Sequence, residues 1–122
     1  MIKEDYVIFE TAKLLKEKGY CNISDTLYKE NSEFVRYKIG LNNKGFSTTL
    51  GNFYEAPTLQ MAMKWLREVH NIHIEIAYNM GYFPVCISTQ TNDAIPYIAM
   101  GRPFTYEVAC EVAIKYCLKN LI

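Results

Sequence analysis

The chain has 122 residues, of which half are hydrophobic and 21% are charged, and thirteen basic residues balance thirteen acidic ones. This size suits a single domain over residues 1–122, large enough to bury a core without a disulfide or a structural metal. The zero net charge excludes the overall basic excess that is typical of domains neutralising many nucleic-acid phosphates.

The N-terminal sequence and the hydrophobic runs predict the cellular compartment of the protein. It is charged from its third residue, so it does not resemble a signal peptide. No run approaches the roughly 18 apolar residues that a membrane span needs. We therefore expect a cytoplasmic protein without a membrane segment.

The first half of the chain predicts one helix and a strand hairpin. Apolar residues at positions 8, 12 and 15 predict a helix over residues 5–18, which Gly19 ends. Strands are expected over residues 26–29 and 34–39, with a turn at residues 30–33. Residues 40–55 are rich in Gly, Asn and Thr and predict a loop, with an edge strand near residues 46–50.

A second helix is expected to begin after Thr58, a good N-cap residue. Its predicted apolar face consists of Leu59, Ala62, Met63, Leu66 and Val69. Alternation of apolar and polar residues then predicts a strand over residues 72–78. Further strands are expected over residues 82–90 and 95–100, with Asn79-Met80-Gly81 as the intervening turn.

The last helix is expected over residues 104–121, with Thr105 as its N-cap. Its predicted inward face consists of Tyr106, Ala109, Cys110, Ala113, Tyr116 and Cys117.

The starts of the last two helices align without a gap, 47 residues apart, from Thr58 and from Thr105. One interpretation is an internal structural repeat of residues 20–70 and 72–121. The other is that two amphipathic helices with threonine caps simply look alike. Both predict an α+β fold: an N-terminal helix, then two strand–strand(–strand)–helix units, with an antiparallel sheet that carries helices on one face.

The only two histidines, His70 and His73, are weak candidates for a metal site. Two ligands three residues apart on one helical turn can share a metal ion, and a metal-dependent enzyme is one alternative function. Here the hydrophobic period changes from 3.6 to 2 between residues 70 and 72. The pair is therefore expected to straddle a helix–strand joint, with Asn71 in the left-handed exit.

Motifs for catalysis or cofactors are missing from the sequence. There is no Gly-x-Ser-x-Gly, no glycine-rich phosphate loop and no Cys-x-x-Cys pair. The four cysteines are expected to be small buried hydrophobic residues. We therefore predict a non-enzymatic protein without a cofactor.

Aromatic residues are the remaining signal, because ten tyrosines and six phenylalanines are many for this length. Tyrosine suits ordinary sheet packing and is also enriched in interfaces. The expected interface residues are Trp65, Tyr78, Tyr82 and Tyr97. They would contact an unknown protein partner or a second copy in a homodimer.

Three blocks carry a family resemblance: DYVIFETAKLLKEKGY, TLQMAMKWLREVHNIHI and EVACEVAIKYCLKNLI. They resemble a family of small uncharacterised proteins of Bacteroides-type gut bacteria and their phages or prophages. The resemblance covers about half of the chain, and its middle block is specific. It implies a small intracellular protein of a mobile element and no particular activity.

A second resemblance is topological. From residue 57 the expected order of helix, three strands and helix is similar to a double-stranded-RNA-binding domain. Those domains open the final helix with lysines, whereas this chain has Thr105-Tyr106-Glu107-Val108. Nucleic-acid binding is thus an alternative function that would need a local basic patch. The candidate residues are Lys13, Lys16, Lys18, Arg36 and Lys38.

Overall fold

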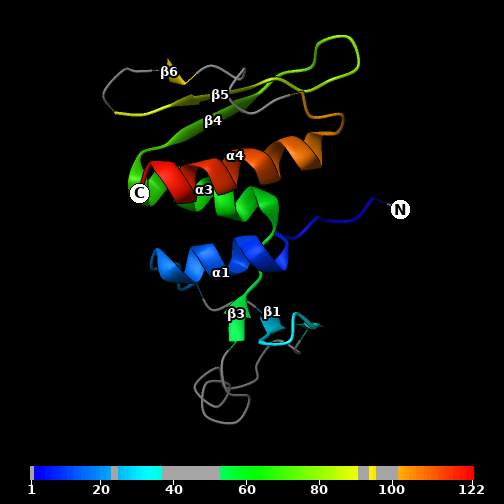
Figure 1. The fold of residues 1–122 in the computed structure, drawn as a ribbon, viewed down its shortest axis with the longest axis vertical. Coiled ribbons are helices and arrows are strands. Elements are labelled where there is room, and N and C mark those ends of the chain that lie inside the picture. The colour runs from blue at the N-terminus through cyan, green and yellow to red at the C-terminus, as the bar shows by residue number, and fades with distance from the viewer. Residues whose placement is uncertain (1, 23–24, 37–52, 91–93, 96–101) are drawn as a thin grey trace. The chain divides into compact units, whose positions relative to one another are not determined.

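The computed structural model describes residues 2–22, 25–36, 53–90, 94–95 and 102–122. Along the chain the elements are α1 (Phe9–Glu17), β1 (Thr26–Lys29), β2 (Phe34–Arg36), β3 (Phe53–Glu55), α3 (Leu59–His70), β4 (His73–Ile76), β5 (Val85–Ser88), β6 (Ala94–Ile95) and α4 (Tyr106–Asn120) (Figure 1). This order confirms the α+β class, with an N-terminal helix followed by two groups of strands that each end in a helix. The strands form two antiparallel sheets, with the orders β2-β1-β3 and β4-β5-β6.

Backbone contacts divide the chain into two compact units. Unit 1 comprises Met1–Asp5 and Thr58–Ile122, and unit 2 comprises Tyr6–Pro57. Each unit therefore contains one of the two sheets. The central strand is β1 in unit 2 and β5 in unit 1, so the similarity between the two halves of the chain does not extend to strand order.

In unit 2, α1 packs on a sheet whose middle strand is β1. Tyr28 of β1 pairs with Phe34 on one side and with Tyr54 on the other, which sets three aromatic residues in a row across the sheet. Thr11, Ala12 and Leu15 of α1 are buried. Gly19 ends the helix with φ 93°, as predicted.

The start of α1 differs from the sequence prediction, because the helix begins at Phe9 and not at Asp5. The residues before it are not helical, and their backbone groups bind Pro57 and the first residue of α3. Within unit 2 the Val7 N–H donates to the Pro57 carbonyl at 3.0 Å, and within unit 1 the Leu59 N–H donates to the Asp5 carbonyl at 2.9 Å. These bonds hold the segment away from the helical conformation.

The predicted hairpin of β1 and β2 is confirmed. Ser32 has φ 70° in the turn, and the Lys29 N–H donates to the Glu33 carbonyl at 2.9 Å. The predicted loop over residues 40–55 is wrong at its end, because Phe53–Glu55 forms β3 on the other side of β1. The edge strand expected near residues 46–50 and the end of the strand expected at 34–39 lie outside the described residues.

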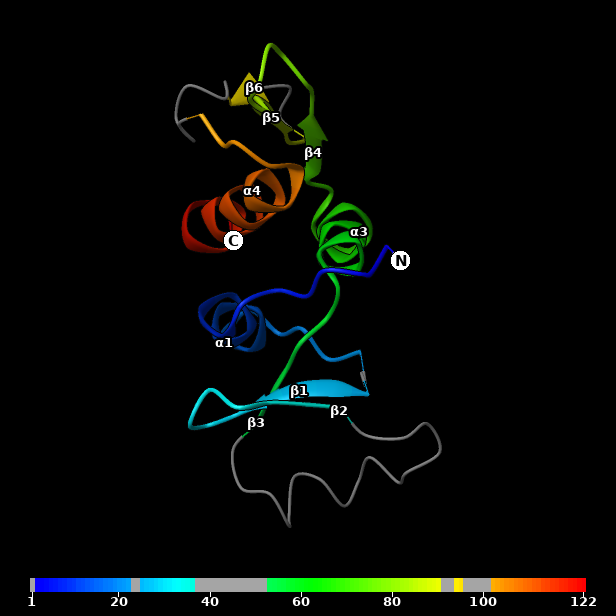
Figure 2. The same ribbon diagram turned by 90° about the vertical axis from the view of Figure 1, so that its right-hand side faces the viewer.

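In unit 1, α3 and α4 pack against each other and α4 runs along the sheet (Figures 1 and 2). Both threonine caps are confirmed: the Thr58 hydroxyl accepts from the Met61 N–H, and the Thr105 hydroxyl from the Val108 N–H, each at 3.1 Å. Asn71 ends α3 in the left-handed conformation, with φ 55°. The joint between α3 and β4 is thus as predicted.

The buried faces of the two helices are shorter or shifted relative to the prediction. Leu66 is the last buried residue of α3, which ends at His70. Val69 lies in the last turn and is 61% exposed. On α4, Tyr106 is 37% exposed and Tyr116 half-buried. The buried residues of α4 are Ala109, Cys110, Ala113, Ile114, Cys117 and Leu118.

The strands of unit 1 are shorter than predicted. β4 ends at Ile76 instead of residue 78, β5 covers only Val85–Ser88, and β6 contains Ala94–Ile95. The rest of the third predicted strand, residues 96–100, lies outside the described residues. Pro84 comes directly before β5 and opposes Ala77; its carbonyl accepts from the Ala77 N–H, but without an N–H it returns no bond, so the ladder is interrupted there.

Candidate functional site

The β4–β5 turn is a two-residue hairpin turn. Asn79 and Tyr82 exchange both backbone hydrogen bonds, at 2.9 and 3.2 Å. Met80 and Gly81 between them have positive φ angles of 46° and 94°. Two positive φ values define a type I′ turn, which matches the right-handed twist of the flanking strands.

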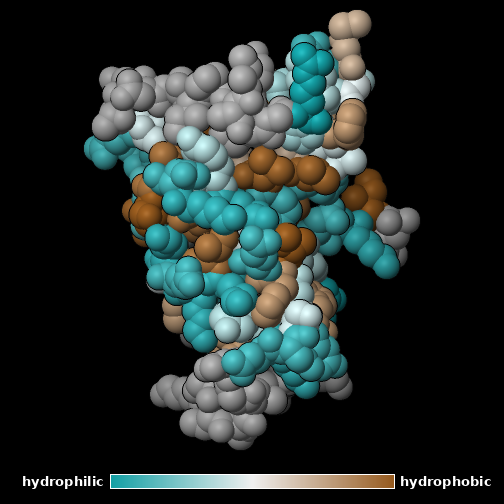
Figure 3. All heavy atoms as spheres, viewed as in Figure 1, coloured by the Kyte–Doolittle hydropathy of each residue, from teal (hydrophilic) through white to brown (hydrophobic). Residues whose placement is uncertain are grey.

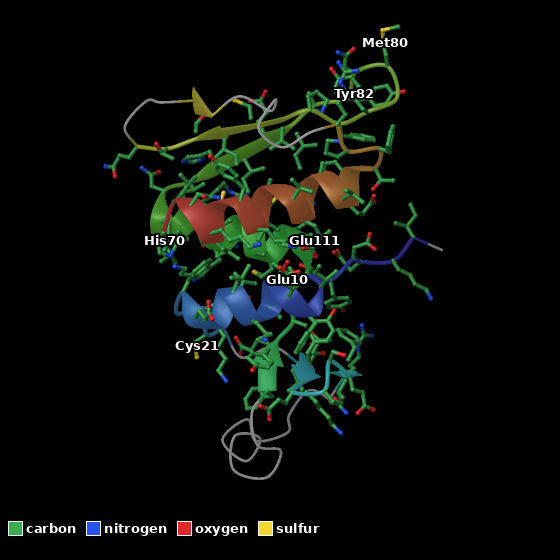
Figure 4. The ribbon with its side chains drawn as sticks, viewed as in Figure 1. Glu10, Cys21, His70, Met80, Tyr82 and Glu111 are labelled. Carbon is green, nitrogen blue, oxygen red and sulfur yellow. The ribbon has the colours of Figure 1, made fainter. Side chains whose placement is uncertain are left out.

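This turn and the segment that leads into α4 carry a group of large side chains, of which Tyr82 and Phe83 are half-buried and the others are exposed. We call this group the turn cluster; its members are Tyr78, Met80, Tyr82, Phe83, Phe104 and Tyr106. Figure 4 shows Met80 and Tyr82 at the end of the hairpin, and Figure 3 shows hydrophobic residues on the surface over the first half of α4. Tyr78 is 69% exposed, Met80 92% and Phe104 79%, so the cluster is open to a partner.

Ring contacts and one backbone bond connect the two segments of the turn cluster. The rings of Tyr78 and Phe83 lie 5.3 Å apart, and those of Phe83 and Tyr106 lie 6.2 Å apart and nearly perpendicular. The Phe83 N–H donates to the Pro103 carbonyl at 2.8 Å. Tyr78, Phe83 and Tyr106 are therefore held in place by ring contacts, which lowers their entropy cost on binding, whereas Met80 and Phe104 are largely exposed.

Polar groups fix two of the tyrosines. The Arg102 guanidinium lies 5.4 Å from the centre of the Tyr82 ring, and the Asn79 side-chain amide donates to the Tyr82 hydroxyl at 3.2 Å. The Gln60 amide of α3 donates to the Tyr106 hydroxyl at 3.1 Å. Tyrosine, phenylalanine, methionine and arginine are the residues enriched in protein interfaces.

Tyr78 and Tyr82, two of the predicted interface residues, both lie near this turn but on opposite faces of the hairpin: the Tyr78 ring contacts Phe83, whereas the Tyr82 hydroxyl bonds to Asn79. Trp65 is half-buried on α3, and its ring contacts the His70 ring at 4.7 Å. Tyr97 lies outside the described residues. The prediction missed Met80 and Phe104; a two-residue turn between strands and an aromatic residue just before a helix cap are the signals that could have found them.

The two histidines have separate partners. The His70 ring packs edge-on against Trp65, and its Nε2 is buried without a hydrogen-bond partner among the described residues. His73 is exposed, and its Nε2 lies 3.0 Å from the Asn71 side-chain oxygen. Within the described ranges, no group of three His, Cys, Asp or Glu side chains could hold a metal ion.

Several of the candidate basic residues lie against aromatic rings of unit 2. Lys13 lies 5.4 Å from the ring centre of Phe9, and Arg36 lies 5.6 Å from that of Tyr6. Lys16 lies 4.9 Å from the Tyr54 ring. These cation–π contacts engage the charges in part, and that of Lys16 involves the aromatic row of unit 2. Lys18 is half-buried, and Lys38 lies outside the described residues.

Of the four cysteines, which were all expected to be buried, the two in α4, Cys110 and Cys117, are buried. Burial raises the pKa of the Cys110 thiol to about 11 and that of the Cys117 thiol to about 12. Such thiols are poor nucleophiles at neutral pH, since the thiolate is the reactive form. Cys21 is exposed and Cys86 is half-buried, which corrects the expectation for these two.

Comparison of the chain with protein-family models, curated proteins and solved structures found no match. In the part of the chain that the structure describes, no helix has the length and apolar character needed to cross a bilayer.

Proposed function

We propose that this chain is a non-enzymatic protein-interaction protein that binds a partner protein through the turn cluster of unit 1. The observation that carries the proposal is the exposure of Tyr78, Met80 and Phe104 on two segments that the Phe83–Tyr106 ring contact joins. Large apolar side chains exposed together are costly in water and mark interaction sites. The Arg102 charge beside Tyr82 would add polar contacts at the rim of such an interface.

The family resemblance extends this proposal to the organism and the compartment in which the protein would act. A chain similar to proteins of gut-bacterial phages and prophages would act in the cytoplasm, as an accessory protein on a host or phage protein. The absence of recognised catalytic motifs from the sequence supports an interaction role over an enzymatic one.

The test is retention of a partner by the tagged protein from lysates of a Bacteroides-type host. The double variant Met80→Asp, Phe104→Asp places charges on two side chains that are exposed to solvent, so the fold is expected to persist while partner retention falls at least about tenfold. The matched control is Met61→Asp, since Met61 is also an exposed methionine, 40% accessible, and lies on α3.

Light scattering on the same samples reports self-association. Equal retention of a protein by the wild type and the double variant would contradict the turn cluster as the site. A strict monomer that retains no host protein would contradict the proposed function as a whole.

Nucleic-acid binding is a second candidate, favoured by the order α3, β4, β5, β6, α4 in unit 1 and by the cations beside the aromatic rings of unit 2. It would act through phosphate contacts, so binding would weaken steeply with salt. A gel shift with double-stranded RNA and with DNA at two salt concentrations tests it. A missing or salt-insensitive shift would remove this candidate.

A further inference from the structure

β4 is an edge strand of the unit 1 sheet. It pairs with β5, and in the strand order β4-β5-β6 its other side faces no described strand. Figure 2 shows β4 at the rim of this sheet, with β5 and β6 on one side of it. A strand edge presents unpaired N–H and C=O groups and can accept a further strand.

The register shows which backbone groups point outward. Ala77 donates to the Pro84 carbonyl, and Asn79 and Tyr82 exchange two bonds, so odd-numbered residues of this strand bond to β5. Hydrogen-bonded and non-hydrogen-bonded pairs alternate in an antiparallel ladder. The N–H and C=O groups of Ile74 and Ile76 therefore point away from β5. The Ile72 N–H already donates to the Leu66 carbonyl, so only the Ile72 C=O can bond to a further strand.

The side chains of β4 separate into two faces. His73 and Glu75 are exposed on the outer face, whereas Ile74 and Ile76 are half-buried on the face toward the helices. Natural edge strands are often protected by lysine, proline or a bulge. The HIEI sequence of β4 contains neither lysine nor proline, and its register with β5 runs without a bulge; its protection is limited to the exposed Glu75 and its length of four residues.

A second copy of β4 could pair with this edge in several registers, and one of them is more favourable than the registers shifted from it. Centred on Ile74, an antiparallel pair opposes Ile74 to itself and His73 to Glu75 of the other copy, twice. Centred on Glu75, the pair would instead oppose two carboxylates, which is unfavourable. Centred on Ile76, it would oppose Glu75 to Ala77 and lose the charge pair.

We propose that β4 pairs with β4 of a second copy, antiparallel and centred on Ile74, so that the two sheets of unit 1 become one continuous sheet. The outward N–H and C=O groups of Ile74 bond to those of the other copy, and the Ile76 N–H bonds to the Ile72 carbonyl. On the outer face His73 of each copy lies opposite Glu75 of the other, so two cross-strand pairs form in which the imidazole ring can donate to the carboxylate. On the inner face the pairing covers the half-exposed isoleucines. This surface is distinct from the turn cluster, so the proposal goes beyond the proposed function.

Disulfide trapping tests the register in the full chain. The background carries Cys21→Ser and Cys86→Ser, which removes the two accessible thiols and keeps the buried ones. Directly opposed residues of a hydrogen-bonded pair have Cα atoms about 5.5 Å apart, within the range of a disulfide. Ile74→Cys is therefore expected to give a covalent dimer under mild oxidation. Glu75→Cys, whose two Cα atoms would lie more than about 7 Å apart, is expected to give little.

Equal or preferential trapping at Glu75→Cys would overturn the register, and no trapping at either position would overturn the pairing. Circular dichroism of each variant before oxidation shows that it is folded.

Charge exchange is the independent test, measured as the dimer Kd by analytical ultracentrifugation. Glu75→Lys is expected to raise the Kd about tenfold or more, because His73 in both cross-strand pairs then loses its carboxylate partner and faces an ammonium group. The double variant His73→Glu, Glu75→Lys is expected to restore it. An unchanged Kd in Glu75→Lys, or a double variant as weak as the single one, would overturn the proposal. The variant Met80→Asp, Phe104→Asp is expected to leave this Kd unchanged, which separates the proposal from the function of the turn cluster.

Discussion

At the scale of single residues, Met80 carries both a backbone strain and a surface role. Its φ of 46° lies in the left-handed region, where a side chain other than that of Gly, Asn or Asp costs about 1 kcal/mol. Its side chain is 92% exposed, so core packing does not explain the choice of methionine. Under the proposed function, the thioether at the tip of the turn is the reason that this strain is kept.

The replacement Met80→Asn separates the two roles. Asn-Gly is the favoured pair for a type I′ turn, so the free energy of unfolding is expected to rise by about 0.5–1 kcal/mol. Partner retention is expected to fall, since the apolar side chain is lost. Chemical denaturation and the lysate experiment measure the two effects. Met80→Leu, which keeps the strain and the apolar surface, is expected to change neither; a destabilised Met80→Asn would contradict this account of the turn.

At the scale of secondary structure, the two helices of unit 1 begin in the same way. The hydroxyl of Thr58 or Thr105 accepts from the N–H three residues later. At α1 the N-cap position is Ile8, which makes no side-chain cap bond. The capped helices are also the longer ones, with 12 and 15 residues against 9. Their caps orient the start of α3 and, at α4, the segment that holds Phe104 and Tyr106.

Removal of either cap is expected to destabilise the protein. Thr58→Ala and Thr105→Ala should each lower the free energy of unfolding by about 1 kcal/mol, because one N–H in the first turn of the helix loses its side-chain acceptor. Denaturant titration with an unchanged m-value checks this. Thr→Ser at the same positions keeps the hydroxyl and is the matched control. If the Ser and Ala variants were equally unstable, the hydroxyl bond would not be the cause.

At the scale of the whole molecule, much of the described core comes from unit 1, and α4 contributes six buried residues to it. Two of these are the thiols of Cys110 and Cys117, both fully buried. Burial raises their pKa values to about 11 and about 12, from 9.0 in an accessible thiol. The native state therefore holds both protons at pH values where the unfolded chain has released them.

This difference predicts a loss of stability in alkali. The contribution is fully present below pH 9 and is lost as the pH rises toward 11 to 12, since the unfolded state then binds fewer protons than the native one. Each thiol contributes a slope of at most about 1.4 kcal/mol per pH unit. Urea unfolding between pH 8 and 11, compared with that of Cys110→Ala, Cys117→Ala, isolates the thiol contribution. Parallel curves for the two proteins would contradict the prediction.

The elements of unit 1 that the sequence predicts best have signals within the element itself. Thr58, the apolar period of α3 and Asn71 together define a helix and its exit; the structure confirms the cap, the exit and the buried positions up to Leu66, whereas Val69 is exposed. β3 has no such signal, because a strand of three residues forms only by pairing with the edge of β1. Its register depends on residues more than twenty positions away, which local patterns do not encode.

The candidate site was predictable only in part for the same reason. Tyr78 and Tyr82 follow from the tyrosine content and the strand pattern around Gly81. Phe104 joins them only because Phe83 binds the Pro103 carbonyl across the fold, which no local pattern shows. Trp65 was expected to be an interface anchor, whereas its ring lies against His70 and is half-buried.

Two backbone hydrogen bonds at the ends of unit 2 affect how the gene for this protein could evolve. Val7 binds Pro57 inside unit 2, and Asp5 binds Leu59 inside unit 1, so the chain leaves and re-enters unit 1 at neighbouring points. Segments whose ends meet in this way are the ones that proteins tolerate as insertions. A recombination event that exchanged the codons for residues 6–57 would therefore replace unit 2 by another segment. The two chain ends of unit 1, at Asp5 and Thr58, would still lie close together.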